Sequence, residues 1–448
     1  MQWLHIILIS MNKMLMVSEV ADEICVSVDT IRRWEKKGLI KAKRSELNYR
    51  LFNLDEVKLI HDKLSGKHQA SNYKILKAEE EAGLTAIDLF AGAGGTALGL
   101  ENAGIKHLML NEIDKHAAAT LRANKPEWNI IEGDIKDVDF TQYRDKVDII
   151  EGGFPCQAFS YAGKKMGFED ARGTLFYEFA RAVKEANPKI AIGENVKGLL
   201  THENGKTLRA MVSILQDLGY KVAHKVLRAQ YFDVPQKRER LVIIAIRNDI
   251  DSSIFYPKEK DYTISIKEAI GDKPESPGQE YSDSKKAIMK LVPAGGCWRD
   301  LPEKLQKEYM KASYYMGGGK TGMARRLSWD EPSLTLTCGP AQKQTERCHP
   351  EETRPLNVRE YARIQTFPDE WQFSGSTGAQ YKQIGNAVPV NLGYYMGITA
   401  RAILNNEYNP DEFEIVEELP LVTEDTLVSD NTNDSGEYLR TQGQLALV

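Results

Sequence analysis

One cysteine, Cys156, stands at a position where it could act as a nucleophile. Residues 152–160 read Gly-Gly-Phe-Pro-Cys-Gln-Ala-Phe-Ser, which places it directly after a proline at the end of an apolar stretch. Glu194 follows a second apolar stretch, and Arg238 and Arg240 alternate before a third. A thiolate is a soft nucleophile, and a carboxyl group can move a proton to or from the ring that is attacked. Together these residues indicate covalent catalysis on a base.

A glycine-rich turn upstream of the cysteine is suited to holding a cofactor. Residues 88–95 read Asp-Leu-Phe-Ala-Gly-Ala-Gly-Gly, and Glu112 follows about 20 residues later. Glycine lets the backbone approach a ligand, and an acid at this spacing can bind ribose hydroxyls. No Gly-Lys-Ser/Thr follows the turn, which disfavours a triphosphate site.

The elements that must position these residues alternate regularly. Apolar strands are expected at 85–90, 107–110, 147–150, 189–192 and 241–246, with helical segments such as 114–123 between them. Apolar strands alternating with helices predict a parallel sheet covered on both faces, which is a doubly wound α/β fold. Ligands of such folds bind beyond the carboxyl ends of the strands.

In type and order, these motifs resemble those of the DNA (cytosine-5)-methyltransferases of bacterial type II restriction-modification systems. The resemblance covers about residues 85–250 and 354–400. It implies an S-adenosylmethionine-dependent methyltransferase domain, with S-adenosyl-L-methionine as cofactor. The residues that it assigns to the cofactor are Phe90, Gly92, Gly94, Gly95, Glu112 (ribose), Asp134 and Ile135 (adenine), Pro155, Asn386 and Val388.

The same resemblance assigns the catalytic roles. Cys156 would add to C6 of a cytosine and Glu194 would assist at N3. Arg240 would contact O2, with Arg238 supporting the same pocket. Gln157, Ser160 and Asn195 are assigned to the DNA side, and Asn195 would also position the catalytic loop. Residues 163–176 correspond to a loop that closes over the flipped base, and Ala162 stands where some members carry a polar residue. Methyl transfer to C5 would follow in duplex DNA of a short specific sequence, protecting it from a cognate endonuclease.

A smaller unit is expected at residues 11–64. A helix with Val28, Ile31 and Trp34 on its inner face is followed by a basic, hairpin-like stretch at 41–50. This order resembles the winged helix-turn-helix of MerR-type regulators. The resemblance implies binding of operator DNA through Arg32 and Arg33, and control of the protein's own operon. The alternative is that these arginines form the solvated face of a small helical domain.

Composition and charge set the remaining boundaries. A linker is expected at 65–84, the catalytic domain at 85–247 and 354–405, an irregular target-recognition domain at 248–353, and an acidic disordered tail at 406–448.

The net charge of −5 is distributed unevenly along the chain, because residues 407–448 carry 11 acidic residues and one basic residue, Arg440. The rest of the chain is therefore mildly basic, as a DNA-binding protein requires.

Several functional classes are disfavoured. Five cysteines without ligand spacing predict neither a disulfide framework nor a metal site, and they fit a reducing cytoplasm. The apolar run at 6–9 is too short for a membrane span and lacks the features of a signal peptide, and Met11 or Met14 could be the true start. Two alternatives remain open. One is an RNA cytosine-5 methyltransferase, and the other is a DNA-binding regulator with an inactive catalytic domain.

Overall fold

The computed structural model describes residues 14–24, 26–45, 48–54, 57, 60, 72–155, 174–317 and 320–421. The chain forms two compact units, which divide between Asn72 and Tyr73. Cys156, Gln157, Ser160 and Ala162 lie outside the described residues, as does the loop expected at 163–176 up to residue 173.

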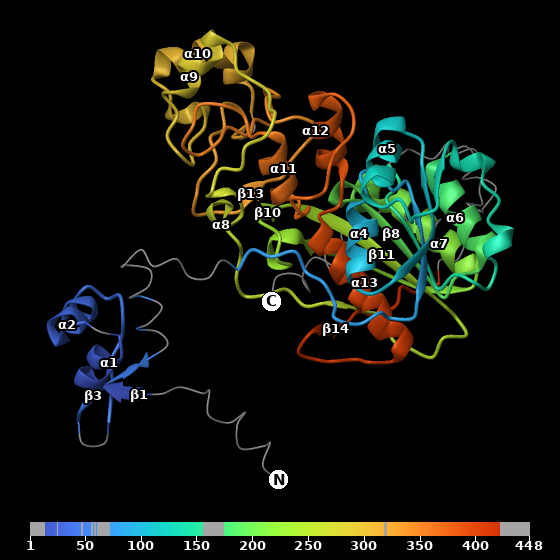
Figure 1. The fold of residues 1–448 in the computed structure, drawn as a ribbon, viewed down its shortest axis with the longest axis horizontal. Helices are drawn as coiled ribbons and strands as arrows, with labels where there is room; N and C mark the ends of the chain where they lie inside the picture. The colour runs from blue at the N-terminus through green and yellow to red at the C-terminus, as the bar shows by residue number, and fades with distance from the viewer. Residues whose placement is uncertain are drawn as a thin grey trace. The chain divides into compact units, whose positions relative to one another are not determined.

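The smaller unit contains two short helices and a three-stranded antiparallel sheet in the order β1-β3-β2 (Figure 1). Its elements are β1 (Met14–Met16), α1 (Val17–Glu23), α2 (Val28–Lys36), β2 (Lys43–Arg44) and β3 (Arg50–Asn53). The hydroxyl of Ser27 accepts the N–H of Thr30 at 3.2 Å and so caps α2. Ile31 and Trp34 are buried, which confirms the predicted inner face. Strands β2 and β3 form the predicted basic hairpin.

The larger unit is built on a seven-stranded sheet in the order β6-β5-β4-β7-β8-β11-β9. Its strands are β4 (Thr85–Leu89), β5 (Lys106–Glu112), β6 (Ile130–Glu132), β7 (Ile149–Gly152), β8 (Ile190–Val196), β9 (Tyr220–Arg228) and β11 (Glu239–Arg247). The first five strands in this order are parallel, as predicted. The prediction is wrong for β11, which runs antiparallel to both β8 and β9. Apolar content shows that a strand is buried, but it carries no information on its direction.

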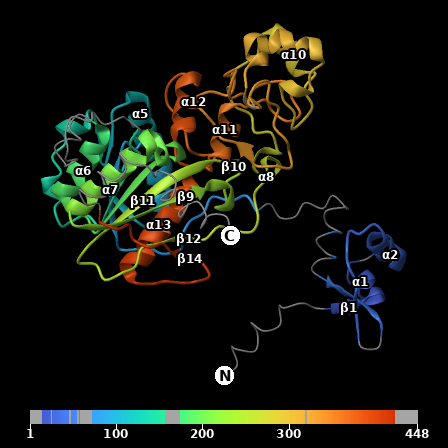
Figure 2. The ribbon, with the colours of Figure 1, turned by 180° about the vertical axis from the view of Figure 1, so that it is seen from behind.

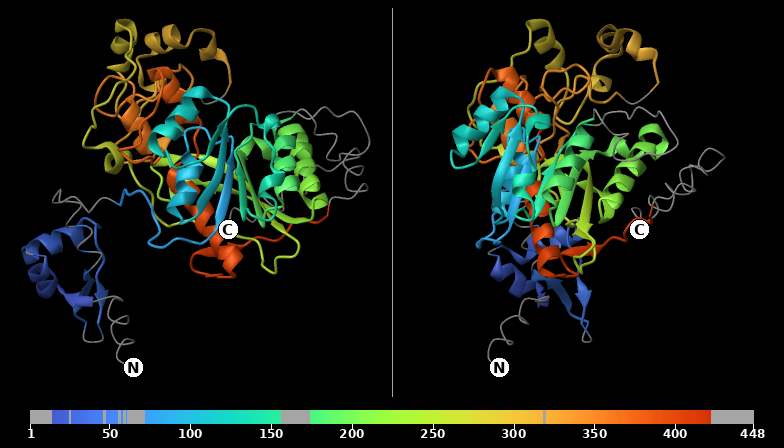
Figure 3. Two further views of the ribbon diagram at one scale, coloured as in Figure 1. Left: turned by 45° about the vertical axis from the view of Figure 1, so that its right-hand side comes forward. Right: turned by 90° about the vertical axis from the view of Figure 1, so that its right-hand side faces the viewer.

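Helices cover both faces of this sheet, as a doubly wound fold requires. Apart from the segment between β11 and α11, the helices of this unit are α4 (Gly95–Asn102), α5 (Lys115–Asn124), α6 (Leu175–Ala186), α7 (Lys206–Asp217), α11 (Val358–Ile364), α12 (Thr377–Asn386) and α13 (Val390–Asn405). Side chains of α6 and α7 pack on one face, against residues such as Ile87 and Ile150. Those of α4 and α13 pack on the other, against Ala86 and Ile149. Figure 3 shows the sheet between the green helices α6 and α7 and the orange helix α13.

Short 3-10 helices connect many of these elements. They are η2 (Ile135–Asp137), η3 (Thr141–Tyr143), η5 (Lys197–Leu200), η6 (His202–Gly205), η7 (Ala229–Tyr231), η8 (Trp298–Asp300) and η9 (Lys311–Tyr315). Among the described helices, none is both long and apolar enough to cross a lipid bilayer.

The region between β11 and α11 is irregular, as its composition predicts. It contains α8 (Ile266–Ile270), α9 (Asp283–Met289), α10 (Glu303–Met310) and β13 (Ser333–Leu334), which pairs with β10 (Gln236–Lys237). Tyr281, Met289, Val292 and Leu301 form a small core of its own. This core is separate from the cores that cover the sheet.

The linker expected at 65–84 extends too far toward the C-terminus. Residues from Tyr73 onward belong to the larger unit. The hydroxyl of Tyr73 donates to the carbonyl of Arg363 at 2.9 Å, and the N–H of Leu76 donates to Asn391 Oδ1 at 2.9 Å. Hydrogen bonds of this kind can hold a polar segment that shows no apolar period, so composition alone does not reveal them.

The expectation of a disordered tail from residue 406 is wrong for its first part. Strand β14 (Phe413–Ile415) pairs with β12 (Phe255–Pro257) near α13 (Figure 2), and the N–H of Leu419 donates to the carbonyl of Val222 at 2.8 Å. Phe413 and Leu419 are buried. Because this segment is mainly acidic, its composition did not indicate that these two apolar side chains pack against the larger unit. Residues 422–448 lie outside the described part of the chain.

Candidate active site

The glycine turn after β4 has the backbone conformation of a ligand-binding loop. Phe90, Gly92 and Gly94 have φ angles of 61°, 55° and 86°. A positive φ is a real outlier for a bulky residue such as Phe90, and strain of this kind concentrates at functional sites. At Gly95 a Cβ would lie 2.0 Å from the carbonyl oxygen of Val388, so that only glycine fits. The turn therefore packs directly against the segment that follows α12.

Glu112 lies at the end of β5 and is tied to the turn. Its Oε2 accepts the N–H of Gly92 at 2.7 Å, and its Oε1 accepts the N–H of Asp114 at 2.6 Å. The side chain is buried, which raises the pKa of its carboxyl group. Asp134 follows β6 and caps η2 through Lys136 N–H, and Ile135 is buried beside it. These acids at adjacent strand ends, beside a glycine turn, fit a nucleoside-bearing cofactor such as S-adenosylmethionine.

The chain that leads into Cys156 is fixed by Asn195. Asn195 Nδ2 donates to the carbonyl oxygen of Phe154 at 2.8 Å. Pro155, the last described residue before Cys156, is exposed. Asn195 is only 3% exposed, so it supports this segment, and a direct contact with DNA would require it to leave its present position.

Glu194 and Arg240 form an ion pair at the ends of β8 and β11. Arg240 Nε lies 2.5 Å from Glu194 Oε1, and both side chains are nearly buried. A Cβ at Gly153 would lie 3.2 Å from Glu194 Oε2, so the acid faces the backbone just before Cys156. The structure therefore places the Glu194–Arg240 pair beside the backbone that leads into Cys156.

Arg238 is 1% exposed and donates to three main-chain carbonyls. Its guanidinium reaches Leu336 O and Gly385 O at 3.2 Å each and Asn386 O at 3.4 Å. Burial, together with the nearby charge of Arg240, lowers its pKa to about 9. Arg238 thus joins the strand of Arg240 to the end of α12, and supports the pocket from behind.

Asn386 is exposed and accepts a hydrogen bond at its Oδ1 from the thiol of Cys338 at 3.1 Å. Val388 is buried against the glycine turn. Cys338 was not singled out in the sequence, because a lone cysteine in an irregular region carries no spacing signal.

The fold and these positions agree with the comparisons to known proteins. Residues 84–400 match the model of the C-5 cytosine-specific DNA methylases. The chain belongs to this family. The match spans every described site residue from Phe90 to Val388.

Two relatives of this DNA methylase are similar over nearly their whole length. Type II methyltransferase M.Eco47II of Escherichia coli is 57% identical over 399 residues, which is 85% of this chain and 94% of the relative. Type II methyltransferase M.PspPI of Psychrobacter sp. is 52% identical over 397 residues, which is 86% of this chain and 95% of the relative. The protein is therefore a DNA (cytosine-5-)-methyltransferase, and the RNA-methylating alternative is set aside.

The fold of the methylase is also found in a solved structure. A protein assigned as a DNA modification methyltransferase of an E. coli prophage superposes with a TM-score of 0.53 and 24% identity, over 72% of this chain and 99% of that chain. At the other end, residues 17–52 match the MerR family of regulatory proteins. This confirms the helix-turn-helix resemblance of the smaller unit.

The two arginines of the smaller unit lie on the exposed side of α2, opposite Ile31 and Trp34. Arg32 forms an ion pair of 3.3 Å with Asp29, and both side chains are mostly exposed. An exposed pair of this kind is weak, so it does not fix the Arg32 side chain firmly.

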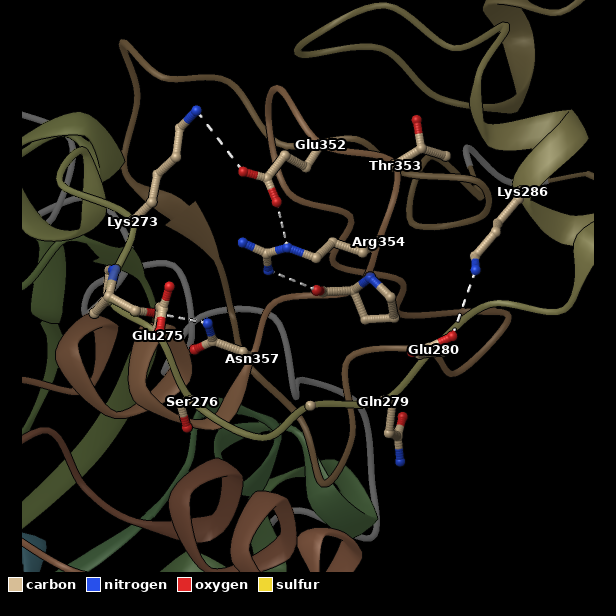
Figure 4. Close-up of a pocket in the computed structure, with 13 residues that line it drawn as sticks. Lys273, Glu275, Ser276, Gln279, Glu280, Lys286, Glu352, Thr353, Arg354 and Asn357 are labelled. Atoms are coloured by element: carbon tan, nitrogen blue, oxygen red, sulfur yellow. Dashed lines mark hydrogen bonds and ion pairs between the residues drawn. The ribbon is translucent and has the colours of Figure 1, made fainter.

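The larger unit of the methylase contains a cavity of about 900 Å3 (Figure 4). It is lined by residues of 273–286 and 352–357. Lys273 and Arg354 pair with Glu352, and Lys286 pairs with Glu280. Its cations are thus already neutralised by its own glutamates, and it contains none of the predicted site residues.

Two buried acids, Asp88 and Glu151, were not expected from the sequence to be part of the site. Each is 1% exposed. Asp88 was seen only as part of the glycine motif. Glu151 could have been identified from the sequence, because it is a charged residue inside the apolar stretch that leads to Gly152.

In the described part of the methylase, no three His, Cys, Asp or Glu side chains are grouped as metal ligands.

Proposed function

We propose that this methylase transfers the methyl group of S-adenosylmethionine to C5 of a cytosine within one short duplex sequence, through a covalent bond to Cys156. The observation that carries the proposal is the Glu194–Arg240 pair, in which the second carboxylate oxygen of Glu194 faces Gly153, three residues before Cys156. A nucleophile, a proton-transferring acid and a cation would thus meet at one strand edge.

The cofactor would occupy the carboxyl ends of β4, β5 and β6. Phe90 would lie against it, Glu112 would accept the ribose hydroxyls, and Asp134 with Ile135 would hold the adenine. Gly92, Gly94, Gly95, Pro155, Asn386 and Val388 would complete the walls. The cofactor supplies an electrophilic methyl group on a positively charged sulfur. The backbone strain at Phe90 and the close approach of Gly95 to Val388 support this placement.

The chain's own groups would carry the proton and the covalent bond. The thiolate of Cys156 adds to C6 of the cytosine, while Glu194 donates or shares a proton at N3. Arg240 holds O2 and keeps Glu194 in place, and Arg238 holds the backbone behind them. After C5 has received the methyl group it loses its proton, the C6–sulfur bond breaks, and Cys156 is released as thiolate.

The target base must leave the duplex, because neither face of its ring is accessible in the stack. Gln157 and Ser160 would contact the DNA around the vacated position, and residues 248–353 would read the sequence. The similarity to type II methyltransferases supports a role in restriction-modification, where methylation blocks a cognate endonuclease. Such a reaction takes place on chromosomal DNA, and the free cysteines fit the cytoplasm.

The smaller unit would bind an operator of the enzyme's own gene. Its match to a regulatory family and the exposed arginines of α2 support this role. A recognition helix in the major groove would give binding that is independent of the methylation site.

Expression in a host followed by bisulfite sequencing would identify the methylated cytosine and its context. A duplex of that sequence with 5-fluorocytosine at the target should then form a denaturation-stable adduct, because fluorine is not lost as a proton. The Cys156→Ser variant, as matched control, should form none. An adduct that persists in the variant would overturn the assignment of Cys156. A chain that methylates no cytosine would be the inactive regulator.

A further inference from the structure

Five ionisable side chains form a row across one face of the sheet, near the carboxyl ends of its parallel strands. In the order of the strands they are Glu112, Asp88, Glu151, Glu194 and Arg240. Asp88 and Glu151 are register partners on β4 and β7, so their side chains point to the same face. The face is that of Ala86 and Ile149, which α4 and α13 cover.

Each of the two central acids of the row has one carboxylate oxygen that lacks a hydrogen-bond donor among the described residues. Asp88 Oδ2 and Glu151 Oε1 are fully buried, and neither accepts a hydrogen bond from any described residue. An ionised carboxylate has no proton to give, so two adjacent carboxylates can bond to each other only if one is protonated. Neither acid forms an ion pair with a described cation, and the nearby Arg240 is already paired with Glu194.

The remaining charges around the pair also favour a bound proton. Burial raises the pKa of both carboxyl groups well above the ordinary range. Glu112 acts on Asp88 in the same direction, and Glu194 acts on Glu151. The two acids that flank the pair, Glu112 and Glu194, thus repel a second negative charge at its centre.

The pair lies at the base of the segments that would hold the cofactor. Asp88 is two residues before Phe90, and its neighbour in the row, Glu112, is bonded to Gly92. The methyl donor carries a sulfonium cation, whereas the product S-adenosylhomocysteine has a neutral sulfur. A buried group whose charge can change beside this site would therefore respond to one ligand and not to the other.

We propose that Asp88 and Glu151 share one proton in the free enzyme and release it when the sulfonium cation binds. This inference rests on the proposed cofactor. The pair then becomes fully negative only while the charged donor is present, and takes the proton back once the methyl group has been transferred. It thereby favours the donor over the product.

The size of the effect follows from charge interactions in proteins. A cation within about 10 Å of a carboxylate, at an effective dielectric constant of about 20, changes a protonation equilibrium roughly tenfold. Because donor binding releases a proton, affinity for the donor should rise with pH, and affinity for the product should not. The ratio of the two affinities should change roughly tenfold across the pH range in which the free pair holds its proton.

Isothermal titration calorimetry of the full-length protein tests the proposal without any turnover. Binding of S-adenosylmethionine and of S-adenosylhomocysteine is measured in three buffers of different ionisation enthalpy between pH 6.5 and 8. The slope against ionisation enthalpy gives the number of protons released. We expect the donor to release up to one proton more than the product does.

The variants separate the pair from the titration of the ligands themselves. Glu151→Gln and, independently, Asp88→Asn should remove the pair's share of the proton release, whereas the ligands contribute equally in all proteins. Asp148→Asn is the matched control, because Asp148 lies just before the start of β7, away from the carboxyl ends of the strands, and is paired with Lys189. It should behave like wild type.

Two outcomes would count against different parts of the argument. Equal proton release with both ligands in the wild-type protein overturns the shared proton, even if neither variant folds. Failure to bind S-adenosylmethionine at all overturns the proposed cofactor.

Discussion

Asn195 Nδ2 donates a 2.8 Å hydrogen bond to the carbonyl oxygen of Phe154, and so joins the end of β8 to the backbone that leads into Cys156. The residue next to each partner matters for the proposed chemistry. Glu194 precedes Asn195, and Pro155 follows Phe154. One buried amide therefore sets the distance between the acid and the nucleophile's segment.

Replacing this amide should slow catalysis more than it weakens cofactor binding. Asn195→Asp removes the donor and places two acceptors against each other, which costs about 1–3 kcal/mol. We expect the single-turnover rate to fall roughly tenfold or more, with the dissociation constant of the cofactor changed by less than about threefold. Asn129→Asp, at an exposed amide that bonds to Leu108 O, is the control. Equal loss of rate and of cofactor affinity would contradict a positioning role.

Glu194→Gln keeps the shape of the side chain but removes its proton-transferring carboxyl group and its charge pairing with Arg240. General acid–base groups contribute about 10²–10⁴ in rate. The variant should lose at least 100-fold in single-turnover methylation while still binding S-adenosylmethionine. A loss of less than about threefold would show that the acid does not act on the base.

Arg238→Met should destabilise the fold, because it leaves the carbonyls of Leu336, Gly385 and Asn386 without their donor. We expect the free energy of unfolding to fall by about 3 kcal/mol or more, measured by urea denaturation. Arg228→Met is the control, since Arg228 is half exposed and pairs with Glu259. It should cost less than about 1 kcal/mol. Similar losses in both variants would mean that the buried carbonyls do not depend on Arg238.

Stability should fall in mild acid because of His224 on β9, whose pKa burial lowers to about 4. The unfolded chain binds the proton at about pH 6.5, so stability conferred by the neutral imidazole is present above that pH and is lost as pH falls toward 4. His224→Gln should remove about 3 kcal/mol of this pH dependence. The free energies of unfolding of the wild type and the variant, compared at pH 7.5 and pH 5, would measure the part of this pH dependence that falls between these two pH values. Parallel pH profiles would exclude a contribution from His224.

Two truncations distinguish the ordered from the acidic part of the C-terminal region. Ending the chain after Leu421 should leave stability nearly unchanged. It should also raise non-specific DNA affinity at low salt, because five acids are removed with one Arg440. Ending it after Asn406 also removes buried Phe413 and Leu419, and should cost about 3–5 kcal/mol. Thermal unfolding and filter binding measure both effects, and equal stability of the two truncated proteins would contradict the packing of β14.

Deleting residues 1–72 should leave sequence-specific methylation intact and abolish binding to the gene's own promoter. Arg32→Ala with Arg33→Ala should act like the deletion, because a lost base contact costs about 1–3 kcal/mol. Gel shifts with promoter and methylation-site duplexes, beside a methylation assay, measure both. Loss of both activities together would show that the smaller unit contributes to DNA binding during methylation.

The sequence predicted the parallel strands and the position of Glu194, because apolar runs and motif order are local properties. It did not predict that β11 runs antiparallel to β8 and β9, because the direction of a strand depends on the path of the chain before it. Here that path includes β9, which is a neighbour of β11 in the sheet. The Asp88–Glu151 pair was equally hidden, since it exists only once β4 and β7 are neighbours in the sheet. Phe413 and Leu419 were hidden by the acids around them. In each case the missing information was a contact between distant parts of the chain.

The contact between Gly95 and Val388 has a consequence for biosynthesis. The proposed cofactor pocket needs residues from both ends of the larger unit, so it cannot form until nearly all of that unit has been translated. The smaller unit is complete more than 300 residues earlier, and N-terminal units fold first during synthesis. A message cut short between them would yield the MerR-like unit, which is proposed to bind an operator, without the proposed cofactor pocket.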